Sequence, residues 1–115
     1  MTITTRPAAE ADLPALLALF RELHPDDPAP PPQAAAAAWR AIERQAGRTI
    51  LVAESAGVVI GTVDCTTLPN LTRGARPFML VENVVVVAAE HRRSGVGATR
   101  LGFRAAAQGY RRYLD

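Results

Sequence analysis

The sequence has no lysine, so all 13 of its basic residues are arginines, against 11 acidic residues in a chain of 115. A single cysteine, Cys65, excludes an internal disulfide and fits a reducing compartment such as the cytoplasm. No apolar run approaches the roughly 20 residues of a membrane-spanning helix, and the N-terminus lacks the features of a signal peptide. We therefore expect one soluble cytoplasmic domain, residues 1–115, without a membrane partner.

The composition also limits the kinds of ligand. Hydrophobic residues make up 49% and charged residues 21%, which are the proportions of a globular domain and exclude a disordered one. His24 and His91 have no metal-ligand spacing with each other or with Cys65, so we expect no metal site. Cys65 lies among apolar strand residues and is expected in the core.

The arginines are concentrated near the C-terminus, where six of them lie in residues 92–112. A guanidinium group presents a planar fork of donors that suits a phosphate-bearing ligand. Nucleic acid is the alternative partner of such a region, but no nucleic-acid-binding motif accompanies the arginines, so we regard it as unlikely.

The pattern of apolar and turn residues predicts an α/β (α+β) domain with a mixed sheet and the element order β-α-α-β-β-β-α-β. The expected strands are near residues 2–7, 49–55, 58–68, 79–87 and 110–114, and the helices near 12–24, 33–46 and 98–108. The turn at 55–57 predicts a hairpin. The last helix connects two strands, which a right-handed crossover would make parallel.

One stretch combines a strand, a glycine-containing turn and the start of a helix. The run VENVVVV leads into HRRSGVG, and ATRLGFRAAAQ follows. This arrangement binds phosphate groups, because backbone N–H groups and the positive end of the helix dipole point at the anion. The sequence therefore predicts an anion site at the turn.

The residues of this stretch carry a resemblance to a known family. The chain resembles the GNAT superfamily of acyl-CoA-dependent N-acetyltransferases, whose signature Q/R-x-x-G-x-G/A corresponds here to residues 92–97, RRSGVG. VAESAGVVIGTV is similar to the second and third strands of the family, and ENVVV followed by HRRSGVGA is similar to the approach to its acetyl-CoA loop. The resemblance extends from about Ile3 to Leu114.

The resemblance implies acetyl-CoA as co-substrate and transfer of its acetyl group to a primary amine by direct attack. The acceptor is expected to be a small-molecule or peptide amine. Glu82 matches the position of a general base, and a backbone N–H of the fourth strand would polarise the thioester carbonyl. The expected cofactor-binding residues are Val84, Val85 and Val86 for the pantetheine arm, and Arg92, Arg93, Ser94, Gly95, Val96, Gly97 and Ala98 for the pyrophosphate.

Some residues have alternative interpretations. Glu82 would have no catalytic role if it were only a strand-end carboxylate paired with an arginine. Asn83 could orient substrate or make a structural hydrogen bond, and we expect it on the opposite face of the strand from Glu82. The regions near His24 and residues 70–76 lie where acceptor sites form in the family.

The sequence departs from the family pattern at its end. It stops where the fifth strand is expected to end, without the usual final helix and strands and the tyrosine that protonates the departing thiolate. Tyr110 and Tyr113 lie too early for that role. The alternative function is a CoA-binding or interaction module without turnover, and the incomplete sheet edge could form a homodimer.

Overall fold

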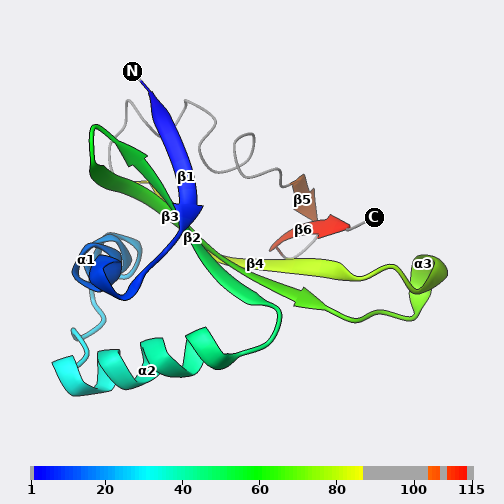
Figure 1. The fold of residues 1–115 in the computed structure, drawn as a ribbon, viewed down its shortest axis with the longest axis horizontal. Helices are drawn as coiled ribbons and strands as arrows, with labels where there is room; N and C mark the ends of the chain where they lie inside the picture. The colour runs from blue at the N-terminus through cyan, green and yellow to red at the C-terminus, as the bar shows by residue number, and fades with distance from the viewer. Residues whose placement is uncertain (1, 87–103, 107–108, 114–115) are drawn as a thin grey trace.

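The computed structural model describes residues 2–86, 104–106 and 109–113 of the chain (Figure 1). Its elements are β1 (Ile3–Pro7), a 3-10 turn η1 (Glu10–Asp12), α1 (Leu13–Leu23), α2 (Pro32–Arg44), β2 (Arg48–Ser55), β3 (Val58–Leu68), α3 (Thr72–Ala75), β4 (Phe78–Val86), β5 (Arg104–Ala106) and β6 (Gly109–Tyr113). None of the helices in these described ranges has the length and apolar character of a membrane span.

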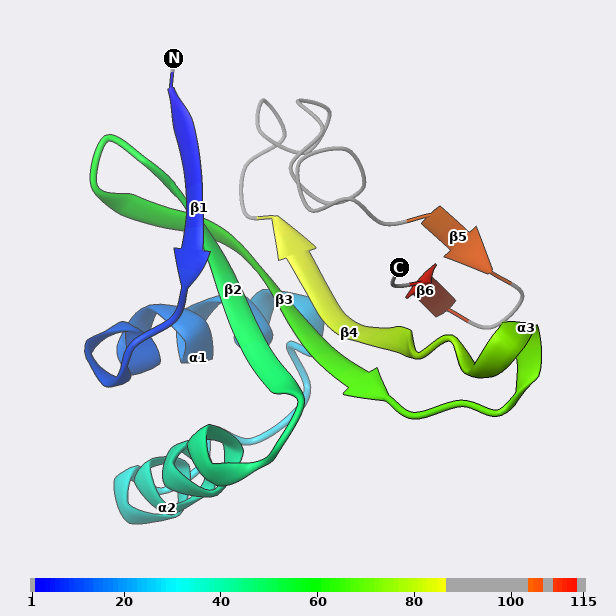
Figure 2. The same ribbon diagram turned by 45° about the vertical axis from the view of Figure 1, so that its right-hand side comes forward.

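The strands form one sheet in the order β1-β2-β3-β4-β6-β5. Figure 2 shows β1 to β4 side by side. Each strand pairs antiparallel with its neighbours, and Ala56 and Gly57, both with positive φ, close the predicted β2–β3 hairpin. The α/β class and the first six predicted elements are confirmed.

Two predictions for the C-terminal segment are wrong. Arg104–Ala106 is a strand and not part of a helix, and β6 runs antiparallel to β4. A single crossover would have returned the chain parallel to β4. Here β5 and β6 pair with each other antiparallel, so the chain reverses once more between Ala106 and Gly109. The remainder of the predicted helix, 98–103 and 107–108, lies outside the described residues.

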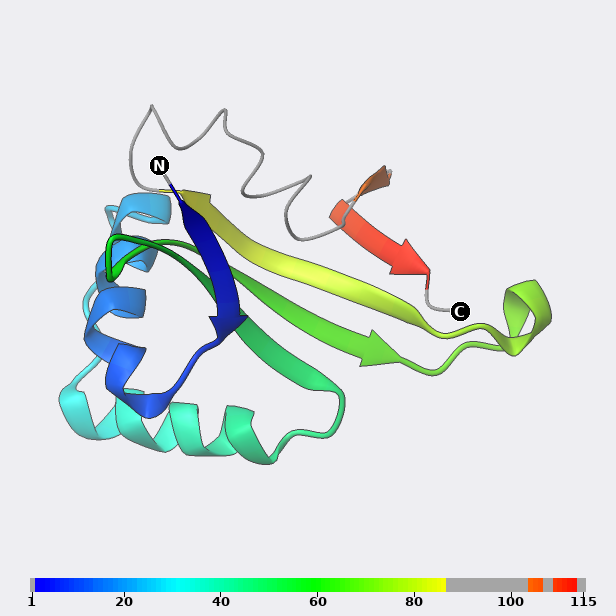
Figure 3. The ribbon, with the colours of Figure 1, turned by 45° about the horizontal axis from the view of Figure 1, so that its top comes forward.

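Helices α1 and α2 lie on the same face of the sheet (Figure 3). Leu16 of α1 and Trp39 of α2, only 1% and 4% exposed, pack with Ile50 and Val52 of β2. The helical spacing of the apolar residues explains this contact, because it places one apolar stripe of each helix on the sheet. Trp39 is the packing anchor that its position predicts.

The opposite face of the central strands is also apolar. Val63 and Cys65 of β3 form a cluster with Val81 of β4, and each is at most 4% exposed. Cys65 is therefore a core residue, as the sequence predicts. Asp64 lies between these two β3 residues, so its side chain is on the helix-covered face.

An ion-pair network joins β1 to the start of α1. Both carboxylate oxygens of Asp12 accept hydrogen bonds from Arg6, at 2.7 and 2.9 Å, and Asp12 Oδ2 also accepts the Ala9 N–H at 2.7 Å. Arg6 additionally pairs with Glu54 of β2. The bonds from Arg6 and Ala9 lower the pKa of Asp12 from 3.8 to about 2, so the ionised carboxylate is the form that stabilises this corner.

Asp12→Asn is expected to lower the free energy of unfolding at pH 7 by about 2 kcal/mol, because charge-assisted bonds are lost from a buried carboxylate. The pKa of Asp12 is lower in the folded state, so its contribution is complete above the unfolded value of 3.8 and decreases as pH falls toward 2. Urea unfolding between pH 7 and pH 3 measures this. Glu10→Gln, an exposed carboxylate change in the same turn, should have little effect, and a pH-independent difference for Asp12→Asn would contradict the assignment.

Gly47 connects α2 to β2 with φ +80°, and an added Cβ would lie 2.8 Å from the carbonyl oxygen of Thr67. The Gly47 carbonyl also accepts the Thr67 N–H at 2.7 Å, so the backbone has little room to move. Gly47→Ala should therefore destabilise the fold by about 2–3 kcal/mol in thermal or urea unfolding. Gly57→Ala is the matched control, since Gly57 has φ +78° but no atom within 4 Å of the added Cβ. Equal losses in the two variants would contradict a steric role for Thr67.

Candidate functional site

The candidate site is built on β4, which contains Glu82. One edge of β4 pairs with β3 from Phe78 to Val86, whereas β6 pairs with the other edge only from Phe78 to Val81. No strand in the described part of the chain pairs with this second edge beyond Val81. The backbone of Glu82 to Val85 is thereby placed to pair with an extended ligand.

A β-bulge interrupts β4 at the same point. Asp64 faces Glu82 and Thr62 faces Val85 across the β3–β4 pair, so Asn83 and Val84 together oppose Val63 alone. Asn83 has φ +53°, a left-handed conformation that asparagine adopts more easily than most residues. The extra residue brings Glu82 and Val85 to the same face of the sheet, the face covered by the helices.

The bulge adds to the prediction for Asn83. Simple alternation predicts its side chain on the opposite face from Glu82, and this stays a prediction. The structure shows Asn83 as an exposed residue of the bulge, where it opposes Val63 together with Val84. Sequence alternation alone could not show the bulge, because the extra residue is defined only by the pairing with β3.

Glu82 lines a cavity of about 130 Å³ on the helix-covered face. The residues around this cavity come from three adjacent strands, and they are Arg48, Asp64, Thr66, Leu80 and Glu82. The Glu82 side chain is exposed, and no hydrogen bond or salt bridge joins its carboxylate to another side chain of residues 2–86. The arginine that shares the cavity is paired with Asp64 and not with Glu82.

That arginine is Arg48, and its partner is Asp64. Arg48 Nε donates to Asp64 Oδ1 at 2.9 Å and Nη2 to Oδ2 at 2.5 Å, while Nη1 donates to Gln45 Oε1 at 3.0 Å. Asp64 is 6% exposed. The pKa of Arg48 is raised, first by its hydrogen bonds to Asp64 and further by the negative charges of Asp64 and Glu82, against the effect of burial.

Sequence reasoning missed the Arg48–Asp64 pair. The two residues are 16 positions apart, and only the β2–β3 pairing brings them together. A signal was present, because Asp64 is the one acid within the apolar run VVIGTVDC and a buried carboxylate requires a partner. Arg48, at the start of the preceding strand, was the natural candidate.

Two further hollows lie in the regions where acceptor sites were expected. A cavity of about 270 Å³ at the end of α1 is lined mainly by Leu17, Phe20, Arg21, His24 and Asp27. A wider hollow of about 480 Å³ lies beside the β3–β4 loop, where the Asn70 side chain bonds Thr72 and the carbonyl of Arg76. Neither hollow includes Glu82 among its lining residues.

The predicted pyrophosphate residues Arg92 to Ala98 lie outside the described residues. Of the predicted pantetheine residues, Val85 is buried and Val84 and Val86 are half-buried. Residues 2–86 contain no group of three His, Cys, Asp or Glu side chains that could hold a metal ion. The described part of the site is therefore one strand with a bulge, an open edge and a carboxylate.

Residues 13–114 match the model of the acetyltransferase (GNAT) family, and the chain belongs to this family. Its structure is similar to that of a candidate acetyltransferase from Agrobacterium tumefaciens, with 42% identity and a TM-score of 0.72. That match covers 85% of this chain and 66% of the other, so the chain spans just under two thirds of this relative's length. A search of curated proteins finds no match.

Two more distant structures share the fold. An acetyltransferase from Trypanosoma brucei is 24% identical with a TM-score of 0.66, over 99% of both chains. Glucosamine-6-phosphate N-acetyltransferase from Arabidopsis thaliana is 18% identical with a TM-score of 0.70, over 84% of this chain and 67% of the other.

Proposed function

We propose that the protein is an N-acetyltransferase that moves the acetyl group of acetyl-CoA to a primary amine of a small-molecule acceptor in the cytoplasm. The observation that carries the proposal is the open edge of β4 beyond Val81, where a bulge follows directly after Glu82. An edge of this kind can pair with the amide groups of an extended pantetheine arm. Membership of the acetyltransferase family supplies the class of reaction.

The proposed chemistry is a direct attack on the thioester. The acceptor nitrogen must be neutral to attack, so Glu82 accepts its proton, directly or through a water molecule. The N–C bond forms, the C–S bond breaks, and the CoA sulfur leaves as a thiolate that is then protonated. A backbone N–H near the bulge stabilises the developing oxyanion on the carbonyl oxygen.

The pyrophosphate of acetyl-CoA is assigned to the backbone amides of Arg92 to Ala98. Gly95 and Gly97 allow the backbone to approach the phosphate oxygens, because neither carries a Cβ. One structure of the same fold, 22% identical with a TM-score of 0.64, was solved with a bisubstrate analogue that contains CoA. A protein of this fold thus binds a ligand that contains CoA.

Acetyl-CoA turnover with a panel of primary amines tests the proposal. Release of the CoA thiol should depend on both the amine and the protein, and mass spectrometry should show the acetylated amine. Binding of acetyl-CoA without any thiol release across the panel would instead favour the alternative of a CoA-binding module. Absence of both binding and release would refute the proposed function.

A further inference from the structure

The cavity beside Glu82 is lined by more acidic than basic residues. Of its lining residues, Asp64 and Glu82 are acids and Arg48 is the one base. Asp64 faces Glu82 across the β3–β4 pair, so the two carboxylates lie on the same face of adjacent strands. Among these five lining residues, all of which belong to residues 2–86, the net charge is therefore negative.

The guanidinium of Arg48 is already engaged. Asp64 receives two of its N–H groups in a bidentate pair, and Gln45 receives a third. A bidentate pair of this geometry, with Asp64 buried and Arg48 half-buried, neutralises the charge of both partners. Within residues 2–86, the charge in this cavity that has no ion-pair partner is the Glu82 carboxylate.

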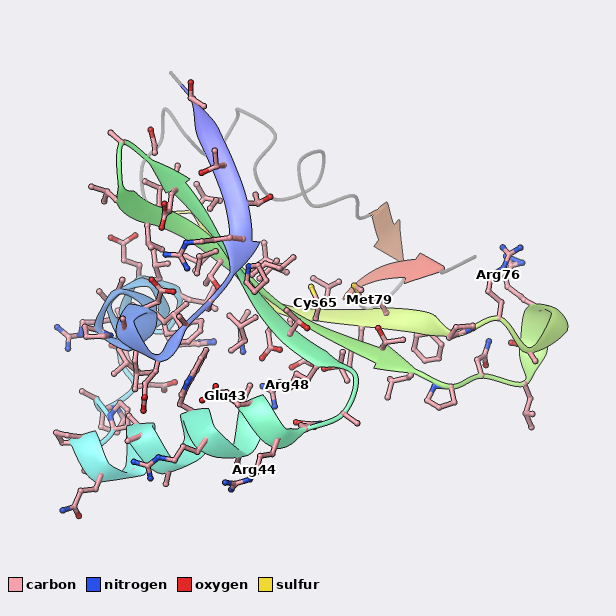
Figure 4. The ribbon with its side chains drawn as sticks, viewed as in Figure 1. Glu43, Arg44, Arg48, Cys65, Arg76 and Met79 are labelled. Atoms are coloured by element: carbon pink, nitrogen blue, oxygen red, sulfur yellow. The ribbon has the colours of Figure 1, made fainter. Side chains whose placement is uncertain are left out.

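Figure 4 shows that Arg48 differs in position from the neighbouring arginine of α2. Arg48 lies between α2 and the strands, whereas Arg44 is on the side of α2 away from the sheet. Arg44 is exposed and does not line the cavity. The two arginines thus provide a test residue and a matched control of the same charge.

We propose that the acceptor is a primary amine without a carboxylate next to its amino group, and that the Arg48–Asp64 pair sets this specificity. The proposal rests on the proposed acetyltransferase function. The ammonium form of the acceptor is attracted to Glu82, and a carboxylate one carbon away would be repelled by it. Asp64 is important because it pairs with the guanidinium of Arg48, which could otherwise bind the carboxylate of the acceptor.

The test compares two acceptors that differ mainly in this group, ethanolamine and glycine. The readout is the ratio of kcat/KM for ethanolamine to that for glycine. Like charges a few ångströms apart in a partly solvated site predict a ratio of about ten or more for the unaltered protein. A ratio near one would overturn the proposal.

Two variants should move the ratio in opposite directions. Asp64→Asn leaves Arg48 without its carboxylate, so glycine is accepted better and the ratio falls by about tenfold. Arg48→Gln leaves the Asp64 carboxylate without its cation, in addition to Glu82. Glycine is then repelled more strongly, so the ratio rises. A purely structural role for the pair would lower both rates and leave the ratio constant.

The double variant Arg48→Gln with Asp64→Asn replaces the ion pair by two neutral amides. It should restore the ratio of the unaltered protein, because the net charge of the pair is again zero. It also covers the case in which a single variant fails to fold. Arg44→Gln and Glu10→Gln make the same charge changes outside the cavity and should leave the ratio unchanged. A shift of similar size in these controls would refute a local effect.

A binding measurement separates failure of this inference from failure of the proposed function. In the ¹⁵N-labelled chain, ethanolamine should shift the amide signals of Asp64, Thr66 and Glu82 at lower concentration than glycine does. This result is expected even if no acetyl transfer occurs, in which case the proposed function fails and the charge selection stands. Equal response to both compounds, with or without turnover, would overturn the inference.

Discussion

Glu82→Gln is expected to lower kcat by a factor of about 10²–10⁴, which is the range for loss of a general base. The variant keeps the size of the side chain but cannot accept the proton of the acceptor ammonium. Because Glu82 is exposed and has no hydrogen bond to another side chain of residues 2–86, the fold should be retained. Steady-state kinetics with acetyl-CoA and a saturating amine measure the effect, and thermal unfolding checks the fold.

The size of the effect distinguishes a base from an electrostatic contribution. Glu82→Asp retains the carboxylate in a shorter side chain and should keep part of the activity, whereas Glu10→Gln should be as active as the unaltered protein. If Glu82→Gln turned over at the original rate with its fold intact, Glu82 would not be the base.

Gly97→Trp is expected to weaken acetyl-CoA binding by about 100-fold or more. A side chain at this position would hold the pyrophosphate away from the backbone amides, and each charge-assisted bond that is lost contributes about 1.5–3 kcal/mol. Isothermal titration calorimetry with acetyl-CoA measures the change. Gly97 lies outside the described residues, so its role comes from the family signature and is tested independently of the structure.

The control for Gly97→Trp is Val58→Trp, which adds the same bulk at an exposed position of the β2–β3 hairpin. This variant should bind acetyl-CoA with unchanged affinity. If Gly97→Trp bound acetyl-CoA as tightly as the unaltered protein, this loop would not be the pyrophosphate site.

The sequence predicted the elements in which local pattern and packing agree. The apolar stripe of α1 predicted its contact with the sheet, and Ala56 with Gly57 predicted the hairpin between β2 and β3. Helix α2 ends at Arg44, shortly before Gly47, which has the positive φ expected after a helix. In these segments the local preference and the tertiary contacts favour the same conformation.

The features that were not predicted depend on contacts between distant segments. The bulge at Asn83 is defined only against β3, and the Arg48–Asp64 pair only through the β2–β3 register. Strand β5 replaced part of an expected helix because its pairing with β6 competes with the helical preference of an alanine-containing segment. None of these can be read from periodicity within one segment.

The central claim is that the open edge of β4 binds the pantetheine arm of acetyl-CoA beside Glu82. Amide hydrogen exchange with and without acetyl-CoA tests it most directly, because pairing with the ligand would protect backbone N–H groups on that edge. We predict increased protection in the segment Glu82 to Val85, with Phe78 to Val81 unchanged. Unchanged exchange in Glu82 to Val85 at saturating acetyl-CoA would contradict the account.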